Sequence, residues 1–191
     1  MGDVDCVKGH WKICGNKSSL NERGGGLLRV VFIFILIVLS SACSTVDTSE
    51  QEPDLIGYVM EKTEDRMLVV SQEPQDFSQT GGVKEFYNAT WLSNVQADIA
   101  IGELVKVWFE GGVAESYPSQ TKLGKFEIIK TERPEGADLS TDQVIRKALM
   151  ELEQLVAIRS LQYDREKDRW DIEFKTIFEE EDLTIHVKDE K

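Results

Sequence analysis

A run of ten apolar residues, residues 30–39, limits most strongly what these 191 residues can fold into. The run is too short to cross a bilayer as a helix, which takes roughly 20 apolar residues. Arg23 and Arg29 precede the run, and small residues follow it. This order is typical of a secretory signal. We therefore expect residues 1–42 to be a signal peptide, and only the remainder of the chain to fold into a globular structure.

The apolar run leads to a cysteine that follows three small residues. Residues 39–43 read Leu-Ser-Ser-Ala-Cys, which resembles the lipobox of bacterial lipoproteins. In that class of protein the cysteine thiol receives a diacylglyceryl group, and the chain is cut just before it. A lipobox usually has leucine three residues before the cysteine, where this chain has Ser40. The resemblance implies lipid attachment at Cys43 and a place at the extracytoplasmic face of the cell membrane. The alternative is a short uncleaved anchor.

Residues 1–29 are longer and more acidic than the start of a usual signal. They contain Cys6, His10 and Cys14, at a spacing that metal ligands can have. A structural metal site of this kind takes a fourth ligand, and no further Cys or His lies nearby in the sequence. Two interpretations stay open: translation begins later in the chain, or the extension is genuine and is removed with the signal.

The charge of the chain excludes one class of function. Lys and Arg number 22 and Asp and Glu 35, which gives a net charge of −13. Residues 1–42 hold five basic and three acidic residues, so their removal leaves 17 basic and 32 acidic residues and a net charge of −15. Proteins that bind nucleic acid carry clustered Lys and Arg instead, so we expect no nucleic-acid partner. Residues 43–53 are polar and acidic, which predicts a flexible tether.

Residues 54–130 are predicted to form a small β domain. Strand-like segments alternate with polar or glycine-containing turns, at residues 55–60, 66–71, 86–92, 104–109, 113–117 and 126–129. Gly111 and Gly112 predict a two-residue hairpin, and residues 97–100 predict a single helical turn. Several short strands punctuated by glycine in one small segment favour a closed barrel or a sandwich.

Short motifs of this segment occur in an order that resembles a known family. They are Gly57-Tyr58-Val59, Leu68-Val69-Val70, Trp91, Ile101-Gly102, Lys106-Val107-Trp108 and, most specifically, Gly-Val-Ala-Glu-Ser-Tyr-Pro-Ser-Gln at residues 112–120. Residues 56–130 thereby resemble the YobA-like domain, an uncharacterised family found mostly in lipoproteins of Gram-positive bacteria. The resemblance implies an OB-like β-barrel and a lipid anchor, and it implies no activity.

Residues 131–138 are predicted to be a linker, and residues 139–191 an α+β unit of a helix and a β-hairpin. Ser140 and Gln143 match a capping box. Apolar residues at helical spacing then continue to residue 156, which predicts an amphipathic helix of about four turns. Alternating apolar residues predict strands around Trp170 and over residues 183–187, with a charged turn at 164–169. This order is weakly similar to that of PepSY-type domains of secreted bacterial proteins.

The candidate contact residues form a predicted binding rim in the β domain, because loops between the strands of OB-like barrels often bind ligands. The rim consists of Trp91, Tyr117, Pro118, Ser119 and Gln120. Trp108 and Trp170 alternate with polar residues in strands, which predicts core packing. His186 is expected on a strand face, and the acidic run at residues 179–182 is expected to be solvated. No metal site and no cofactor are predicted.

Two classes of function fit these patterns. The first is a non-enzymatic, membrane-anchored binding protein whose partner is an envelope protein, a peptide or a wall component. The alternative is an envelope hydrolase, or a subunit of one, that uses two carboxylates held roughly 5–9.5 Å apart. A concave site with buried carboxylates would favour the hydrolase, and an exposed aromatic rim would favour the binding protein.

Overall fold

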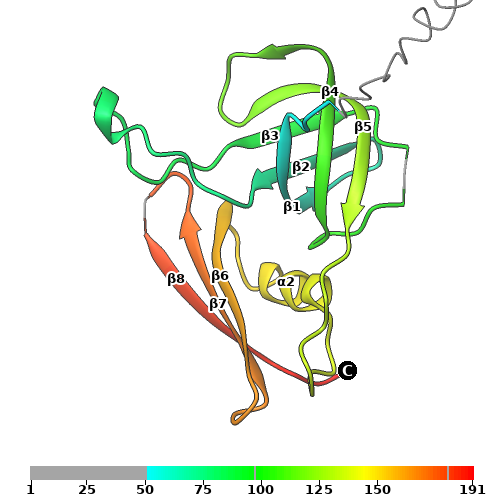
Figure 1. Ribbon diagram of the computed structural model, residues 1–191, viewed down its shortest axis with the longest axis vertical. Coiled ribbons are helices and arrows are strands. Elements are labelled where there is room, and N and C mark those ends of the chain that lie inside the picture. Colours follow the sequence, from blue (N-terminus) through cyan, green and yellow to red (C-terminus); the bar gives the residue numbers. More distant parts are fainter. Residues whose placement is uncertain (1–50, 97, 180) are drawn as a thin grey trace, which may run out of the picture. The chain divides into compact units, whose positions relative to one another are not determined.

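A computed structural model describes residues 51–96, 98–179 and 181–191. All the described residues belong to one compact unit, Glu50–Lys191. The predictions for Cys6, His10, Cys14 and Cys43 lie outside the described residues. The elements in chain order are β1 (Leu55–Lys62), β2 (Arg66–Ser71), η1 (Ser78–Thr80), β3 (Ala89–Ser93), β4 (Leu104–Ala114), β5 (Ser119–Ile129), α2 (Thr141–Leu149), β6 (Val156–Asp164), β7 (Arg169–Thr176) and β8 (Asp182–Lys188) (Figure 1).

The first five strands close into a barrel in the order β1-β2-β3-β5-β4, and β4 pairs with β1 to complete it. Four of the neighbouring pairs are antiparallel, whereas β3 and β5 run parallel. The barrel is followed by a helix and a three-stranded antiparallel sheet in the order β6-β7-β8. This architecture confirms the predicted fold class, mostly β with an α+β C-terminal part, and it is compatible with an OB-like barrel.

Strand β2 explains how the barrel and the C-terminal part share their packing. It is buried on both faces, because successive side chains of a strand point to opposite sides. Met67 and Val69 belong to a core cluster made only of barrel residues, whereas Leu68 and Val70 belong to a second cluster. That second cluster also contains residues of α2, β6, β7 and β8. The side chains of β2 that point out of the barrel therefore pack in a core shared with the helix and the three-stranded sheet.

Helix α2 begins as the sequence predicts but is shorter than four turns. The Ser140 N–H donates to Gln143 Oε1 at 3.0 Å, as in a capping box. The helix ends at Leu149, where hydrogen bonds to the third residue back tighten the chain into turns, from Glu151 N–H to the Ala148 carbonyl and from Leu152 N–H to the Leu149 carbonyl. The helical spacing of apolar residues continues beyond the helix because Leu152, Leu155 and Val156 pack on the same core. The first two lie in the connection after α2, and Val156 lies in β6.

Two predicted local structures in the barrel are wrong. Gly111 and Gly112 do not form a hairpin, because β4 runs through them to Ala114 and the chain reverses at residues 115–118. Gly111 has φ of +86° where the register between β4 and β5 is interrupted. The glycines therefore allow an irregularity in the strand pairing and do not form a turn. In the predicted helical turn, the described residues 98–100 are not helical.

Candidate functional site

Tyr117 is placed by the turn that joins β4 to β5. Its hydroxyl donates a hydrogen bond to the Tyr87 carbonyl at 2.7 Å, and its side chain is 38% exposed. Burial raises the pKa of Tyr117 to about 12, so the hydroxyl stays protonated and keeps donating. Ser116 Oγ donates to the Pro118 carbonyl at 2.8 Å within the same turn. These bonds hold the ring of Tyr117 at a set position, half covered and half open to solvent.

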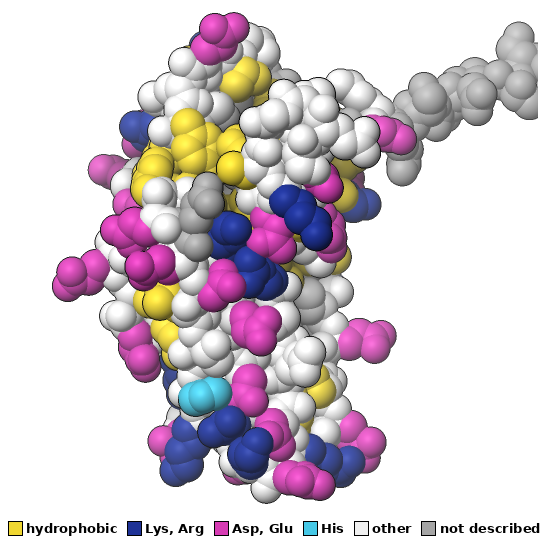
Figure 2. All heavy atoms as spheres, turned by 90° about the vertical axis from the view of Figure 1, so that its left-hand side faces the viewer, with side chains coloured by type: hydrophobic (Ala, Val, Ile, Leu, Met, Phe, Trp, Pro, Cys, Tyr) yellow, Lys and Arg dark blue, Asp and Glu magenta, His cyan; other side chains and the backbone are white. Residues whose placement is uncertain are grey.

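Tyr117 is part of a continuous set of four aromatic rings, which we call the aromatic row: Phe77, Phe86, Tyr117 and Phe178. The centroids of successive rings lie 5.5, 5.3 and 6.0 Å apart, within the range of favourable aromatic pairs. Phe77, Tyr117 and Phe178 are exposed by 41%, 38% and 66%. On the face of the molecule drawn in Figure 2, hydrophobic side chains gather toward the upper part, with basic and acidic side chains beside them.

A small hollow lies beside the aromatic row. Its volume is about 210 Å³, and its walls include Val83, Phe86, Tyr117, Lys175 and Ile177. Sites for drug-sized ligands usually have about 300–1,000 Å³. The hollow is therefore sized for a single side chain of a partner.

A cluster of ion pairs fastens the segments that carry the aromatic row. Glu85, next to Phe86, pairs with both Arg159 of β6 and Lys175 of β7, and Arg159 also pairs with Asp182 of β8. Hydrogen bonds from Arg159 and Lys175 lower the pKa of Glu85, so this carboxylate stays ionised. The loop before β3 thus lies beside the β7–β8 connection (Figure 1), although the two are far apart in the sequence.

Two other residues of the predicted rim, Trp91 and Pro118, lie together in a groove. The groove has a volume of about 360 Å³ and is also lined by Met60 and Leu68 of the barrel and Leu152 after α2. The Arg66 guanidinium lies 4.9 Å from the centroid of a Trp91 ring, and Arg66 Nη2 donates to Gln120 Oε1 at 3.3 Å. Ser119 and Gln120 belong to strand β5 rather than to a loop. The structure therefore separates the predicted rim: Tyr117 belongs to the aromatic row, Trp91 and Pro118 line this groove, and Ser119 and Gln120 line neither.

The two tryptophans expected in the core differ. Trp170 is 2% exposed, and its indole Nε1 donates to Asp189 Oδ1 at 3.0 Å, so its core position is confirmed. The same prediction is wrong for Trp108, because Val105 and Val107 take the inward positions of β4 and the alternation turns residue 108 outward. Trp108 Nε1 donates to the Gln51 carbonyl at 2.7 Å, and Lys125 Nζ lies 4.4 Å from a ring centroid.

Asp189 is the buried carboxylate among the described residues, and its contacts hold segments of the fold together. It is 3% exposed and accepts hydrogen bonds from the N–H groups of Asp138 at 2.5 Å and Leu139 at 2.9 Å, besides the indole of Trp170. Burial raises its pKa, but these hydrogen bonds outweigh burial, so the pKa is lowered overall. Asp189 thus fastens the linker before α2 to the end of the sheet. The hydrolase alternative stays a prediction.

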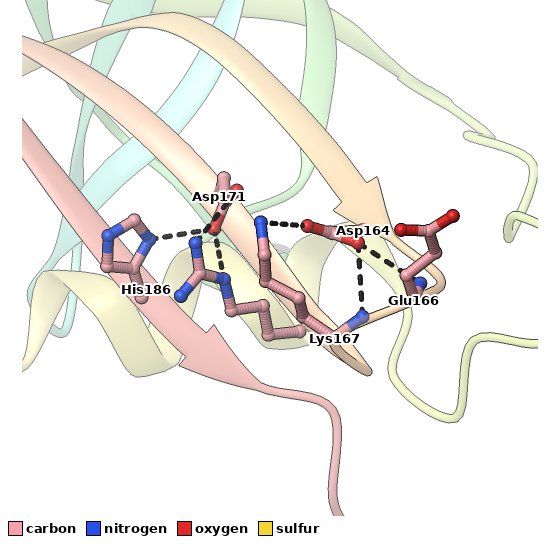
Figure 3. A network of polar contacts seen from close by, with 6 residues as sticks. Asp164, Glu166, Lys167, Asp171 and His186 are labelled. Carbon is pink, nitrogen blue, oxygen red and sulfur yellow. Dashed lines mark hydrogen bonds and ion pairs between the residues drawn. The ribbon is translucent and has the colours of Figure 1, made fainter.

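A polar network covers the exposed face of the C-terminal sheet (Figure 3). His186 Nδ1 lies 2.7 Å from Asp171 Oδ1, to which Arg169 Nε also comes within 2.9 Å. Asp164 accepts from the N–H groups of Glu166 and Lys167 in the turn between β6 and β7. His186 therefore sits on a strand face, as predicted, where Asp171 joins neighbouring strands.

Within residues 51–96, 98–179 and 181–191, no group of three His, Cys, Asp or Glu side chains is placed to hold a metal ion. In that same part of the chain, no helix has the length and apolar character needed to cross a membrane. Of the acidic run at 179–182, Glu180 lies outside the described residues, and Asp182 pairs with Arg159.

The barrel corresponds to a defined domain family. Residues 56–130 match the family described as "Protein of unknown function (DUF3221)". The match spans the barrel from β1 to the end of β5. Comparisons with curated proteins and with solved structures found no match. The DUF3221 domain supplies Phe77, Phe86 and Tyr117, whereas Phe178 comes from the C-terminal sheet, so the aromatic row needs both parts of the chain.

Sequence reasoning found Tyr117 but missed the other three members of the aromatic row. Phe77 and Phe178 are single aromatic residues in polar, acidic connections, which alone indicate nothing about their neighbours. The sequence pattern predicts that a strand starts at Phe86, whereas this residue makes an isolated bridge with Gln75 before β3 begins. One feature of the sequence does indicate these residues. They are large apolar side chains in loops, where packing within a regular strand or helix does not account for them.

Proposed function

We propose that this protein is a lipid-anchored, extracytoplasmic, non-enzymatic binding protein that holds a protein partner on the aromatic row. The observation that carries the proposal is the row itself, four adjacent rings of which three are substantially exposed. Exposed apolar patches of this kind are typical of interaction sites. Aromatic side chains dominate the binding energy of protein interfaces. The lipobox-like residues before Cys43 and the acidic tether at residues 43–53 support the proposed location.

The surroundings of the aromatic row suit it to binding. Tyr117 is fixed by its hydrogen bond to the Tyr87 carbonyl, and Glu85 is fixed by two cations. A surface that is already ordered loses less conformational entropy when a partner binds. The hollow of about 210 Å³ offers a place for one anchoring side chain, which is the usual form of an interface hot spot.

The proposal is tested by photo-crosslinking in cells with the full chain. We expect p-benzoylphenylalanine in place of Phe178 to yield a discrete crosslinked product with a partner, because this side chain is 66% exposed. The additional substitution Tyr117→Ala should reduce the yield at least about fivefold, since a central interface aromatic contributes more than ~1 kcal/mol. Denaturation of the Tyr117→Ala protein checks that it is folded.

The matched control carries the crosslinker in place of Ile128, which is 42% exposed near the opposite end of β5 from Tyr117. That position should not yield the same product. Equal products from both positions, or an unchanged yield from a folded Tyr117→Ala protein, would show that the aromatic row is not the binding surface.

A further inference from the structure

We propose that the partner segment held by the aromatic row is cationic as well as apolar: a peptide stretch of another protein in which Lys or Arg alternates with large apolar side chains. This inference rests on the proposed function, because it specifies the chemistry of the partner at the same surface. It follows from the charges around the row and from the size of the hollow beside it.

The carboxylates around the aromatic row are exposed and are not neutralised by ion pairs. Asp76 adjoins Phe77, and Glu179 adjoins Phe178. Glu181 follows in the same connection, and Glu73 lies close enough to raise the pKa of Tyr87. Within the described part of the chain, none of these four carboxylates forms an ion pair.

The cations near the row do not offset this negative charge. Arg159 and Lys175 are matched by Glu85 and Asp182, so that cluster of two cations and two carboxylates is neutral. Lys84 is the exposed cation in the loop that carries Phe77 and Phe86, where it acts on Asp76. Four carboxylates against one lysine leave the surroundings of the row negative, and the net charge of the whole chain has the same sign.

The aromatic rings and the carboxylates favour the same partner chemistry. The hollow has the volume of about one side chain and apolar walls at Val83, Phe86 and Ile177. A cation beside a side chain seated there can meet a carboxylate or lie over a ring face of the row. A polyanionic or acidic segment would place like charges together, which opposes binding. A polar cationic segment would leave the apolar surface of the row in contact with water.

The test measures binding of three synthetic twelve-residue peptides to the full chain in nanodiscs of zwitterionic lipid, with empty nanodiscs as the blank. The first peptide alternates Lys with Leu and Phe, the second has Glu in place of Lys, and the third has Ser in place of Leu and Phe. We expect the first to bind at least about tenfold more tightly than either of the others. Its affinity should fall as salt rises from 50 to 300 mM, since exposed charges are screened.

Two variants connect this preference to the aromatic row. Phe178→Ala should weaken binding of the first peptide about tenfold. The double substitution Glu179→Gln and Glu181→Gln should weaken it about threefold and reduce the salt dependence. The matched controls are Ile128→Ala for the aromatic change and the pair Glu64→Gln and Glu132→Gln for the charge change, all at exposed positions elsewhere, and they should leave affinity unchanged.

Equal binding of the basic and acidic apolar peptides, or equal effects of the control variants, would overturn the inference. If the crosslink at position 178 still forms in that case, the row binds a partner of other chemistry and only the inference fails. If the crosslink fails as well, the proposed function fails with it.

Discussion

Replacing Asp189 by asparagine is expected to lower the free energy of unfolding by roughly 2–3 kcal/mol, because it removes a buried charge that accepts three hydrogen bonds. The amide of asparagine keeps one acceptor oxygen and turns an N–H₂ group toward donors that the carboxylate had satisfied. A buried donor left without a partner costs about 1–3 kcal/mol. The measurement is urea denaturation of the full chain in a zwitterionic detergent, followed by tryptophan fluorescence.

The difference in the free energy of unfolding between the wild type and Asp189→Asn should also depend on pH. The pKa of Asp189 in the folded protein lies below its ordinary value of 3.8. The contribution of the ionised carboxylate is therefore fully present above that value and is lost as the pH falls through the lower, folded-state pKa. The gap between the wild type and Asp189→Asn should be constant near neutral pH and should narrow in acid below about pH 3.8.

The neighbouring carboxylate provides the control for Asp189. Glu190 is exposed and pairs with Lys188 at the surface, so Glu190→Gln should leave the urea midpoint nearly unchanged. Equal stability of the wild type and Asp189→Asn at neutral pH would contradict the role assigned to Asp189 in fastening the linker to Trp170 and the sheet.

Replacing Gly102 by alanine is expected to destabilise the protein by about 3 kcal/mol or more. Gly102 has φ of +91°, which disfavours any residue with a Cβ. A Cβ at this position would also come within 2.3 Å of the Asp142 carbonyl oxygen in the first turn of α2. The substitution therefore strains the barrel loop and pushes against the helix that packs on it.

Gly111→Ala separates these two effects. Gly111 has a similar φ of +86°, but a Cβ there would meet nothing within 4 Å. The free energy of unfolding of this variant should fall only by the cost of the backbone conformation, about 1 kcal/mol. Both variants are compared with the wild type by thermal unfolding of the full chain. Similar losses for Gly102→Ala and Gly111→Ala would show that the barrel and α2 do not meet closely at this point.

The residues that sequence reasoning placed correctly are those that local patterns determine. Strand β2 was predicted with its observed bounds, because a run of apolar and β-branched residues between polar turns has few other solutions. Ser140 and Gln143 identified the start of α2 through a local hydrogen-bonding pattern. The alternation around Trp170 predicted a strand with a buried face, which β7 has.

The errors arise where distant parts of the chain decide the outcome. Val156 fits a helical spacing, yet its position in β6 is determined by pairing with Thr176 of β7. Two adjacent glycines favour a hairpin, yet β4 pairs with β5 on both sides of them, at Glu110 with Lys122 and at Ala114 with Gln120, so the strand continues through them. The aromatic row depends on a barrel loop, a barrel turn and a sheet connection meeting in space, which no spacing along the chain indicates.

The measurement that tests the account most directly is fatty-acid labelling of the cellular protein combined with its intact mass, beside a Cys43→Ala control. We expect label to be incorporated only when Cys43 is present, and the mass to correspond to a chain that begins at residue 43 and carries lipid. Such a result would place the aromatic row outside the membrane, where the proposed partners are envelope proteins. An unlabelled, uncut chain, or equal labelling of Cys43→Ala, would contradict the proposed anchor and location.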